Sequence, residues 1–318
     1  MPPQTIGGRN AVVVVVGATA AGKTAVSLPL AQMLDAEIIS ADSRQVYRYM
    51  DIGTAKPTAE ERAAVPHHFV DIRDPDEDYN AGLFGDEARA EVARIDARGK
   101  GVLVVGGSGL YVQSLIDGFF DGPPADPEFR DRAEERLARE GLAVMLEELG
   151  RVDPAMRARI DVTKPRRVIR ALEVYHTTGR PISALQEERK VAVPFAPVVF
   201  GLAVERAELY RRIEERCDRM LGEGLEEEAA ALEARGYPAT LNALNTVGYA
   251  EVYAWRRGEI PREEMVRLFK QNSRRYAKRQ GTWFRKDARV VWIEAGGGRS
   301  AGSIAEEIAG HLRRGSRS

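Results

Sequence analysis

The stretch Val12–Val26, VVVVVGATAAGKTAV, decides the fold of this 318-residue chain. Its apolar part, Ala11–Val16, is β-branched without polar alternation, which is typical of a strand buried on both faces of a parallel sheet. The eight residues that follow, Gly17–Thr24, match the pattern G-x-x-x-x-G-K-[ST] in full. A helix is expected at Lys23–Leu34. Because strand, loop and helix come in this order, the stretch predicts a phosphate-binding loop rather than a chance glycine turn.

The composition of the loop explains why it suits an anion. Small residues let backbone N–H groups turn inward, and the following helix adds the positive end of its dipole. Lys23 supplies a mobile charge, and the Thr24 hydroxyl can bind Mg²⁺, the cofactor that we expect. The residues expected to bind the phosphate group are Gly17, Ala18, Thr19, Ala20, Ala21, Gly22, Lys23 and Thr24. Nucleotide-binding proteins, ATP-binding ones included, carry such loops, but the loop itself specifies only an anion.

Further strands predict the fold class. Glu37–Ser40 and Val102–Val105 are short apolar strands, the second followed by a glycine turn, and another strand is expected at His68–Ile72. Asp42 follows the first of these strands. We therefore predict an α/β fold, a P-loop NTPase-like doubly wound parallel sheet in which ligands gather at the carboxyl ends of the strands.

A change of texture predicts a helical insertion domain. Glu128–Ala184 is dense in Arg, Glu, Leu and Ala with helical periodicity, whereas Val191–Glu205 returns to β-character. The predicted domains are the first part of the core at 1–120, the insertion at 121–190, and the return to the core with C-terminal helices at 191–318. The helices expected in the core are Tyr79–Arg98 (apolar side Leu83, Phe84, Ala88, Val92 and Ile95), Glu208–Arg235 and Arg262–Trp283.

Composition bounds the compartment. Cys217 is the single cysteine, which excludes an internal disulfide framework and a Cys-based zinc finger. No apolar run approaches the roughly 20 residues of a membrane span, and the first ten residues lack the features of a signal or transit peptide. We expect a cytoplasmic protein with no membrane partner, acting as a monomer.

Two basic stretches stand out against a net charge of −1. Lys164–Arg170 has four positive charges in seven residues, and Arg267–Lys286 contains no acidic residue. In the second stretch a basic stripe at helical spacing consists of Arg267, Lys270, Arg274 and Lys278. Charge runs are usually solvated helix faces, but this segregation makes a polyanion partner equally plausible.

Taken together, these motifs resemble the tRNA dimethylallyltransferase (tRNA isopentenyltransferase) family over nearly the whole chain. The segments similar to family signatures are Gly17–Thr24, Ile39–Pro57, Pro66–Pro75, Val105–Tyr111, Arg166–Pro181, Thr246–Val252 and Ala277–Arg285. Ala18 stands where the family usually has proline, and Ser108 where threonine is common. The resemblance is to the bacterial type, because the cysteine- and histidine-bearing extension of eukaryotic members does not follow.

The resemblance implies an activity and its substrates. The loop is expected to hold the pyrophosphate of dimethylallyl pyrophosphate. The dimethylallyl group is expected to go to the exocyclic N6 amine of the adenine 3′-adjacent to the anticodon in tRNA, with release of pyrophosphate. The partners implied are therefore the tRNA anticodon stem-loop and this donor.

The resemblance also suggests roles for single residues. Asp42 is the candidate general base, although a turn cap is its structural alternative. Thr19 is a candidate reaction-centre hydroxyl, and Lys23 and Arg216 are candidate cations on the pyrophosphate, although a lone arginine on a charged helix, such as Arg216, is more often a surface residue. The residues expected to contact tRNA are Asp42, Ser43, Arg44, Gln45 and Ser108 near the target base, Arg130, Arg166, Arg167, Val168, Ile169 and Arg170 in the insertion, and Lys278 and Arg279 in the last long helix.

Three alternatives remain open at this stage. An adenylate isopentenyltransferase would perform the same chemistry on free AMP, ADP or ATP and needs no RNA-binding insertion. A P-loop small-molecule kinase would need a further acidic Mg²⁺ site, yet Val102–Val105 runs into Gly-Gly-Ser instead. The third alternative is a non-catalytic RNA-binding switch. This sequence has no recognisable guanine-reading N-K-x-D segment, which argues against a GTPase switch.

Overall fold

The computed structural model describes residues 5–6, 9–118, 122–123, 126–188 and 193–315. They form two compact units. One unit, called the core unit below, comprises Met1–Asn80, Phe84–Ile116 and Val193–Ser318, and the other, the helical unit, comprises Ala81–Leu83 and Asp117–Ala192. Each unit is described by itself.

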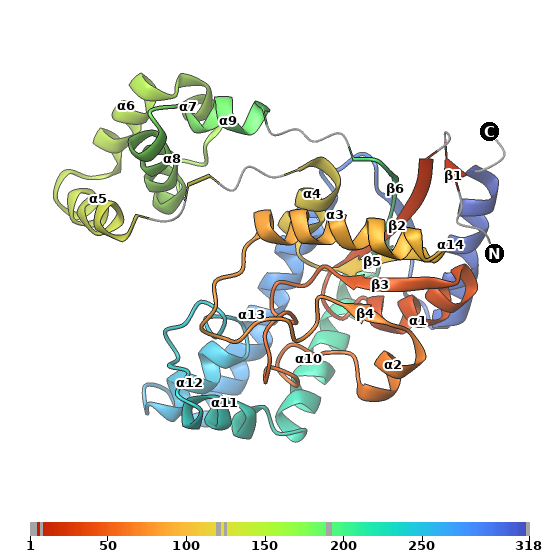
Figure 1. The fold of residues 1–318 in the computed structure, drawn as a ribbon. Helices are drawn as coiled ribbons and strands as arrows, with labels where there is room; N and C mark the ends of the chain where they lie inside the picture. The colour runs from red at the N-terminus through yellow and green to blue at the C-terminus, as the bar shows by residue number, and fades with distance from the viewer. Residues whose placement is uncertain (1–4, 7–8, 119–121, 124–125, 189–192, 316–318) are drawn as a thin grey trace. The chain divides into compact units, whose positions relative to one another are not determined.

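A parallel sheet forms the centre of the core unit (Figure 1). Its strand order among the described residues is β4-β3-β5-β2-β6-β7, and every neighbouring pair is parallel. The strands are β2 (Arg9–Gly17), β3 (Ala36–Ser40), β4 (His67–His68), β5 (Gly101–Gly106), β6 (Ala196–Ala203) and β7 (Val291–Glu294), and β1 (Thr5–Ile6) pairs antiparallel with β2. This order confirms the predicted fold class.

The valine run lies in the middle of the sheet and is covered on both faces. Val13 and Val15 pack into a cluster with helices α1 (Lys23–Leu34) and α14 (Ala301–Gly315). Val14 and Val16, which point to the opposite face, are equally inaccessible to solvent. Continuous β-branched sequence without alternation thus gives a doubly buried strand, as predicted.

The core unit contains further helices besides α1 and α14. They are α2 (Ala59–Ala64), α3 (Ala81–Ala97), α4 (Gly109–Asp117), α10 (Arg206–Gly222), α11 (Leu225–Ala234), α12 (Tyr249–Arg256) and α13 (Arg262–Phe284). Helix α13 is the longest described, and it lies beside α10 (Figure 1).

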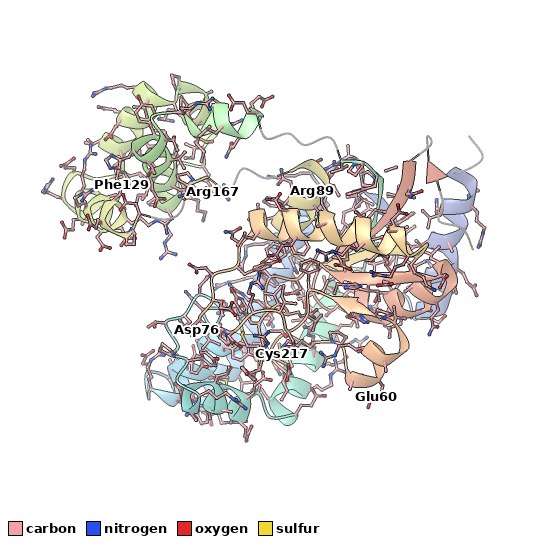
Figure 2. All side chains as sticks on the ribbon, in the orientation of Figure 1. Glu60, Asp76, Arg89, Phe129, Arg167 and Cys217 are labelled. Carbon is pink, nitrogen blue, oxygen red and sulfur yellow. The ribbon has the colours of Figure 1, made fainter. Side chains whose placement is uncertain are left out.

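The helical unit contains no described strand. Its helices are α5 (Pro127–Glu140), α6 (Leu142–Val152), α7 (Pro154–Arg159), α8 (Pro165–Thr178) and α9 (Ile182–Glu188). They share a core of their own that includes Met145, Leu149 and Leu172. Phe129 stacks on His176 at 4.9 Å between ring centroids and ties α5 to α8 (Figure 2).

Three sequence predictions were wrong in detail. The strand expected at His68–Ile72 ends at His68, because Phe69 and Asp71 have φ angles of 64° and 58° that no strand tolerates. The helix expected at Glu208–Arg235 is two helices, α10 and α11, separated at Gly224, where φ is 104°. Leu83, expected on the buried side of its helix, is 41% exposed.

Candidate active site

The loop after β2 is closed around its own lysine. The Lys23 Nζ donates to the carbonyl oxygens of Gly17 at 3.0 Å and Ala18 at 2.9 Å. Ala20 has a φ of 62° and Gly22 a φ of 95°, so two residues of the loop adopt left-handed backbone. Non-glycine residues seldom adopt that backbone region, and those that do are often found in functional loops. The loop presents its turns at the carboxyl end of β2.

The turn after β5 lies beside the end of β3. The Ala41 N–H donates to the Val105 carbonyl at 2.8 Å, and the Ser108 N–H donates to the Ala41 carbonyl at 3.2 Å. A Cβ atom on Gly106 would lie 2.1 Å from the Ala41 oxygen, so only glycine fits there. These contacts place Asp42, the next residue, beside the glycine turn that follows β5.

Asp42 combines the two roles that its position suggested. Its Oδ1 accepts the Arg44 N–H at 2.9 Å, which is the turn-cap contact. The residue is half-buried and lines the same cleft as the loop. Capping uses one carboxylate oxygen, and the other accepts no hydrogen bond from the described residues.

A cleft of about 760 Å³ in the core unit joins these parts. The predicted residues that line it are Thr19, Ala20, Gly22, Lys23, Thr24, Asp42, Arg44, Gln45 and Arg216. Helix α10 contributes Arg216, and helix α13 contributes Phe269, Tyr276 and Gln280. The cleft thus brings together residues up to 261 positions apart in the sequence.

Charge concentrates in this cleft. Burial, together with the nearby charge of Arg216, lowers the pKa of Lys23 to about 8, and Asp42 acts in the opposite direction. Burial also lowers the pKa of Arg216, again against Asp42. Burial together with the charge of Asp42 raises the pKa of Tyr276 to about 12. Two cations held close together without full compensation favour an anionic ligand.

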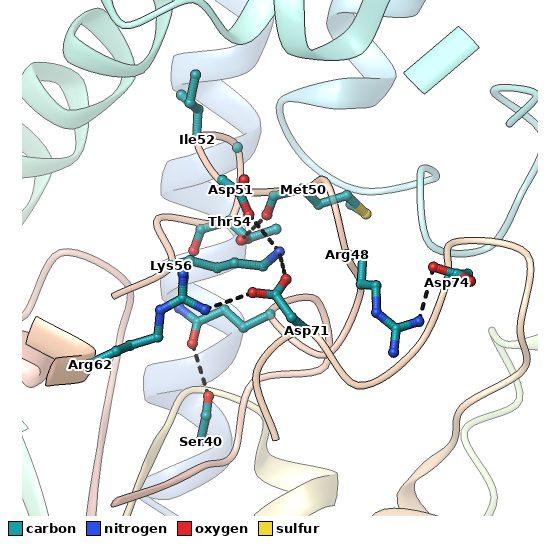
Figure 3. A network of polar contacts seen from close by, with 12 residues as sticks. Ser40, Arg48, Met50, Asp51, Ile52, Thr54, Lys56, Arg62, Asp71 and Asp74 are labelled. Carbon is teal, nitrogen blue, oxygen red and sulfur yellow. Dashed lines mark hydrogen bonds and ion pairs between the residues drawn. The ribbon is translucent and has the colours of Figure 1, made fainter. Parts of the chain in front are cut away.

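A further lysine was missed by the sequence reasoning. The side chain of Lys56 is 3% exposed, and its Nζ contacts Asp51 at 2.7 Å and Asp71 at 2.5 Å (Figure 3). Asp71 also accepts from Arg62 at 2.8 Å. Lys56 lines the cleft but is fully engaged by carboxylates. Only its place in the segment Ile39–Pro57, similar to a family signature, marked it.

Glu228 holds the segment that carries Lys56. Its carboxylate accepts the backbone N–H groups of Asp51, Ile52 and Gly53 at 2.7, 2.8 and 3.0 Å, and the hydroxyl of Tyr249 at 2.5 Å. Successive N–H groups converging on one anion form a nest, here filled by the protein's own side chain. Glu228 therefore holds the backbone of the segment that leads into Lys56 in the wall of the cleft.

Comparison with known proteins decides the family. The family described as IPP transferase matches residues 45–287, more than half of the chain. The chain belongs to this family. A tRNA dimethylallyltransferase of Geobacter metallireducens is 48% identical over 287 residues, which cover 90% of this chain and 93% of that protein. One of Cytophaga hutchinsonii is also 48% identical, with the same coverages.

Solved structures agree with this assignment. The full-length tRNA isopentenylpyrophosphate transferase of Bacillus halodurans aligns with a TM-score of 0.71 at 41% identity, covering 96% of this chain and 98% of that one. A eukaryotic dimethylallyltransferase acting on tRNA aligns with a TM-score of 0.79 at 27% identity, covering 94% of this chain and 77% of that one. The likeness extends over both units of this IPP transferase.

Two residues expected near the target base have other contacts in this IPP transferase. The side-chain amide of Gln45 accepts from the Ser40 hydroxyl at 2.9 Å and donates to the carbonyls of Thr54 and Ala55 at 3.3 and 3.0 Å. Its amide is thus hydrogen-bonded within the protein, and its contact with the tRNA stays a prediction. The Arg44 guanidinium donates to the Asn242 carbonyl at 2.9 Å.

The arginines of the helical unit that are predicted to contact tRNA divide into two groups. Arg130 and Arg170 both bind Glu173, whose side chain is 0% exposed, with N–O distances of 2.8 Å. Val168 and Ile169 are buried in the core of the helical unit, so the expectation that their side chains contact RNA is wrong. Arg166 and Arg167 are exposed, and the described residues offer them no ion pair (Figure 2).

The basic stripe of α13 is largely compensated. The three stripe residues with partners pair as Arg267 with Glu264, Lys270 with Asp218, and Arg274 with Glu214. The acidic partners come from outside the sequence window that contains no acidic residue. Contact of these three cations with a polyanion stays a prediction. Lys278 and Arg279 are exposed, and Arg279 lies over the ring of Tyr276.

The site fits a magnesium ion bound largely through a ligand. Among the described residues no group of three or more His, Cys, Asp or Glu side chains is arranged to hold a metal. Mg²⁺ commonly takes one or two protein oxygens and completes its shell with phosphate oxygens and water. The side chains of Thr24 and Asp42 both line the cleft, so their oxygens meet that requirement.

Among the described residues, none of the helices has the length and apolar character that a membrane span requires.

Proposed function

We propose that this IPP transferase moves a dimethylallyl group from dimethylallyl pyrophosphate to the exocyclic N6 amine of the adenine 3′-adjacent to the anticodon in tRNA, releasing pyrophosphate. The observation that carries the proposal is the cleft itself. It places a phosphate-binding loop, a second cation at Arg216 and a carboxylate at Asp42 around one space. The names of the relatives, all tRNA dimethylallyltransferases, support the acceptor.

Cleavage of the donor requires stabilisation of its leaving group. The bond between C1 of the allyl group and the pyrophosphate oxygen breaks, and positive charge spreads over the allyl carbons. Lys23 and Arg216 lie where they stabilise the departing pyrophosphate, together with the backbone N–H groups at the start of α1. When bound at Thr24, Mg²⁺ supplies further neutralisation of that charge.

The acceptor must lose one proton as the new bond forms. The N6 amine is a weak nucleophile because its lone pair is delocalised into the purine. Its proton becomes acidic only as the bond from N6 to C1 forms, so an ordinary aspartate is a strong enough base at that moment. Asp42 fits this role, since its cap contact uses only one oxygen.

The RNA must open to reach this carboxylate. A base stacked in the anticodon loop cannot enter a cleft, so we propose that the target adenine is flipped out. Arg166 and Arg167 are proposed to bind the phosphate backbone from the helical unit, because they are exposed and form no ion pair with the described residues. Lys278, Arg279, Ser43 and Ser108 remain proposals for contacts near the core unit.

The test is transfer of label to defined acceptors. Purified protein is incubated with labelled dimethylallyl pyrophosphate and Mg²⁺, and with an anticodon stem-loop that carries adenine or inosine at the target position. Label is expected on the adenine stem-loop alone, since inosine has no exocyclic amine. Faster labelling of free AMP than of the stem-loop would favour an adenylate isopentenyltransferase instead. ATP turnover without the allyl donor would favour a kinase.

Three further properties complete the proposal. We expect Mg²⁺ to be required, so removal by a chelator should abolish transfer and added Mg²⁺ should restore it. We also propose that the protein acts as a monomer in the cytoplasm. Light scattering of the protein alone and with one equivalent of stem-loop tests the monomeric state. The expected masses are those of one chain, and of one chain with one RNA.

A further inference from the structure

Helix α13 places a polar residue on its buried side. The buried residues of this helix follow helical spacing along one stripe: Met265, Phe269, Ser273, Ala277, Gln280 and Phe284. Gln280 is 7% exposed, and a buried side-chain amide is costly unless its hydrogen bonds are made. The proposed function gives this residue no role.

Gln280 bridges the two glycine turns of the cleft. Its Nε2 donates to the Gly107 carbonyl at 3.0 Å, and its Oε1 accepts the Thr19 N–H at 2.8 Å. The reverse orientation of the amide would set a donor against the Thr19 N–H, so the two partners fix its orientation. One side chain thus joins the loop after β2 to the turn after β5.

The peptide group between Ala18 and Thr19 is held at both ends. Its carbonyl oxygen accepts from the Lys23 Nζ at 2.9 Å, and its N–H donates to Gln280. A peptide group with both polar atoms bonded on opposite sides resists the rotation that would turn the adjoining side chain. Thr19, which lines the cleft, is thus fixed by both contacts in the unliganded protein. Once Lys23 turns to a bound pyrophosphate, Gln280 is the contact that still sets the direction of Thr19.

The surroundings leave little room for an alternative arrangement. A Cβ atom on Gly107 would lie 2.2 Å from the Gln280 Nε2. A Cβ atom on Gly109 would lie 2.2 Å from the Trp283 Nε1, one turn further along the same helix. Helix α13 thus packs directly on the glycine turn, and the position of Gln280 is determined by the backbone that it contacts.

We propose that Gln280 is a positioning residue for the transfer reaction, which acts by fixing the Ala18–Thr19 peptide and hence the Thr19 hydroxyl at the reaction centre. The inference rests on the proposed function. It predicts that loss of Gln280 lowers kcat, while affinity for the RNA, whose phosphate backbone is proposed to be bound by Arg166 and Arg167 of the helical unit, stays the same.

The test is a double-mutant cycle on transfer of label to the stem-loop. Gln280→Met removes both hydrogen bonds with little change in size, and Thr19→Val removes the hydroxyl. Each is expected to lower kcat about 10- to 100-fold, since small misplacements at a reaction centre cost this much. The double variant is expected within about threefold of the slower single variant, because both changes act on one group. The matched control, Thr282→Ala, lies exposed on the same helix and should keep wild-type kcat.

The outcomes separate the inference from the proposed function. If wild-type protein transfers no label, the function fails. If wild type is active and Gln280→Met has wild-type kcat, or if the two single effects multiply in the double variant, the positioning role is overturned. If Gln280→Met does not fold, Gly107→Ala serves in its place: its methyl group displaces the Gln280 amide, and the same cycle with Thr19→Val should give the same non-additivity. Independent effects there would overturn the inference too.

Discussion

The core unit and the helical unit use their charged residues in opposite ways. In the cleft of the core unit, Lys23 and Arg216 are held near each other in surroundings that lower the pKa of both. In the helical unit, Arg130 and Arg170 close on the buried carboxylate of Glu173. Cations without a full set of anionic partners in the protein favour the binding of an anionic ligand, whereas cations paired with carboxylates contribute to the folded structure. The same residue type therefore marks chemistry in one unit and stability in the other.

The largest effect should come from the carboxylate in the cleft. Asp42→Asn keeps an oxygen to accept the Arg44 N–H, so the turn survives while the base is lost. We expect the transfer rate in single-turnover measurements to fall about 10²- to 10⁴-fold with RNA affinity unchanged. Asp131→Asn, an exposed aspartate in the helical unit, is the control. Near wild-type rates in Asp42→Asn would show that the cleft does not contain the base.

Loss of the buried carboxylate in the helical unit should affect stability instead. Burial acts to raise the pKa of Glu173, but hydrogen bonds from Arg130 and Arg170 outweigh it and hold the pKa below its usual range. Glu173→Ala should lower the free energy of unfolding by about 2 kcal/mol, since both arginines remain partly exposed and solvated. Denaturant unfolding measures this, and Glu128→Ala, which breaks a long surface contact to Arg132, should change little.

The same ion pairs predict a pH dependence with a definite sign. A carboxylate whose folded pKa is depressed stabilises the fold above its unfolded pKa, and this contribution is lost as pH falls through the folded pKa. The free energy of unfolding of the wild-type protein should therefore decrease as the pH falls from the unfolded pKa of Glu173 through its lower folded pKa. That of Glu173→Ala should decrease less over the same range of pH. Equal losses in both proteins would show that Glu173 does not contribute.

Donor binding should weaken with rising pH. With a pKa of about 8 in the free protein, Lys23 loses its charge above that pH. If the ammonium binds the pyrophosphate, the affinity for dimethylallyl pyrophosphate should fall about tenfold between pH 7 and pH 9. Titration calorimetry measures this, with Lys23→Met as the variant that should bind weakly and show a flatter profile. A profile that is equally steep in both proteins would remove Lys23 from the explanation.

The smallest effect should come from single exposed arginines in the helical unit. Arg166→Gln and Arg167→Gln should each weaken RNA binding several-fold and reduce the slope of log affinity against log salt by about 0.7 to 0.9. Donor affinity should not change. Arg151→Gln, equally exposed on α6, is the control. An unchanged salt slope in both variants would place the RNA grip elsewhere.

The fold was largely predictable because its signals are local. A doubly buried strand has to be apolar throughout, so the valine run and its partner Val102–Val105 identified the centre of the sheet. The errors have local conformational causes that periodicity does not register. Positive φ angles at Phe69 and Asp71 end β4, and Gly224 separates two helices that share one charge pattern.

The site was only half predictable because its second half comes from distant segments. The loop motif identified residues up to Thr24, and the family resemblance brought in Asp42 and Arg216. Gln280 contacts Thr19, which lies 261 positions away in the sequence. Lys56 is held by the carboxylates of Asp51 and Asp71. No rule of residue spacing predicts either set of contacts. Conversely, the stripe on α13 looked basic because Glu214 and Asp218, which compensate it, lie on another helix.

The most direct test of the contrast between the units is a crystal structure of this IPP transferase with Mg²⁺ and pyrophosphate. The account predicts the anion in the core unit, against the backbone N–H groups of residues 20–24 and within reach of Arg216. The Lys23 Nζ should then have left the carbonyls of Gly17 and Ala18 to contact a phosphate oxygen. Pyrophosphate bound at the arginines of α8, with the loop still closed on its own lysine, would contradict it.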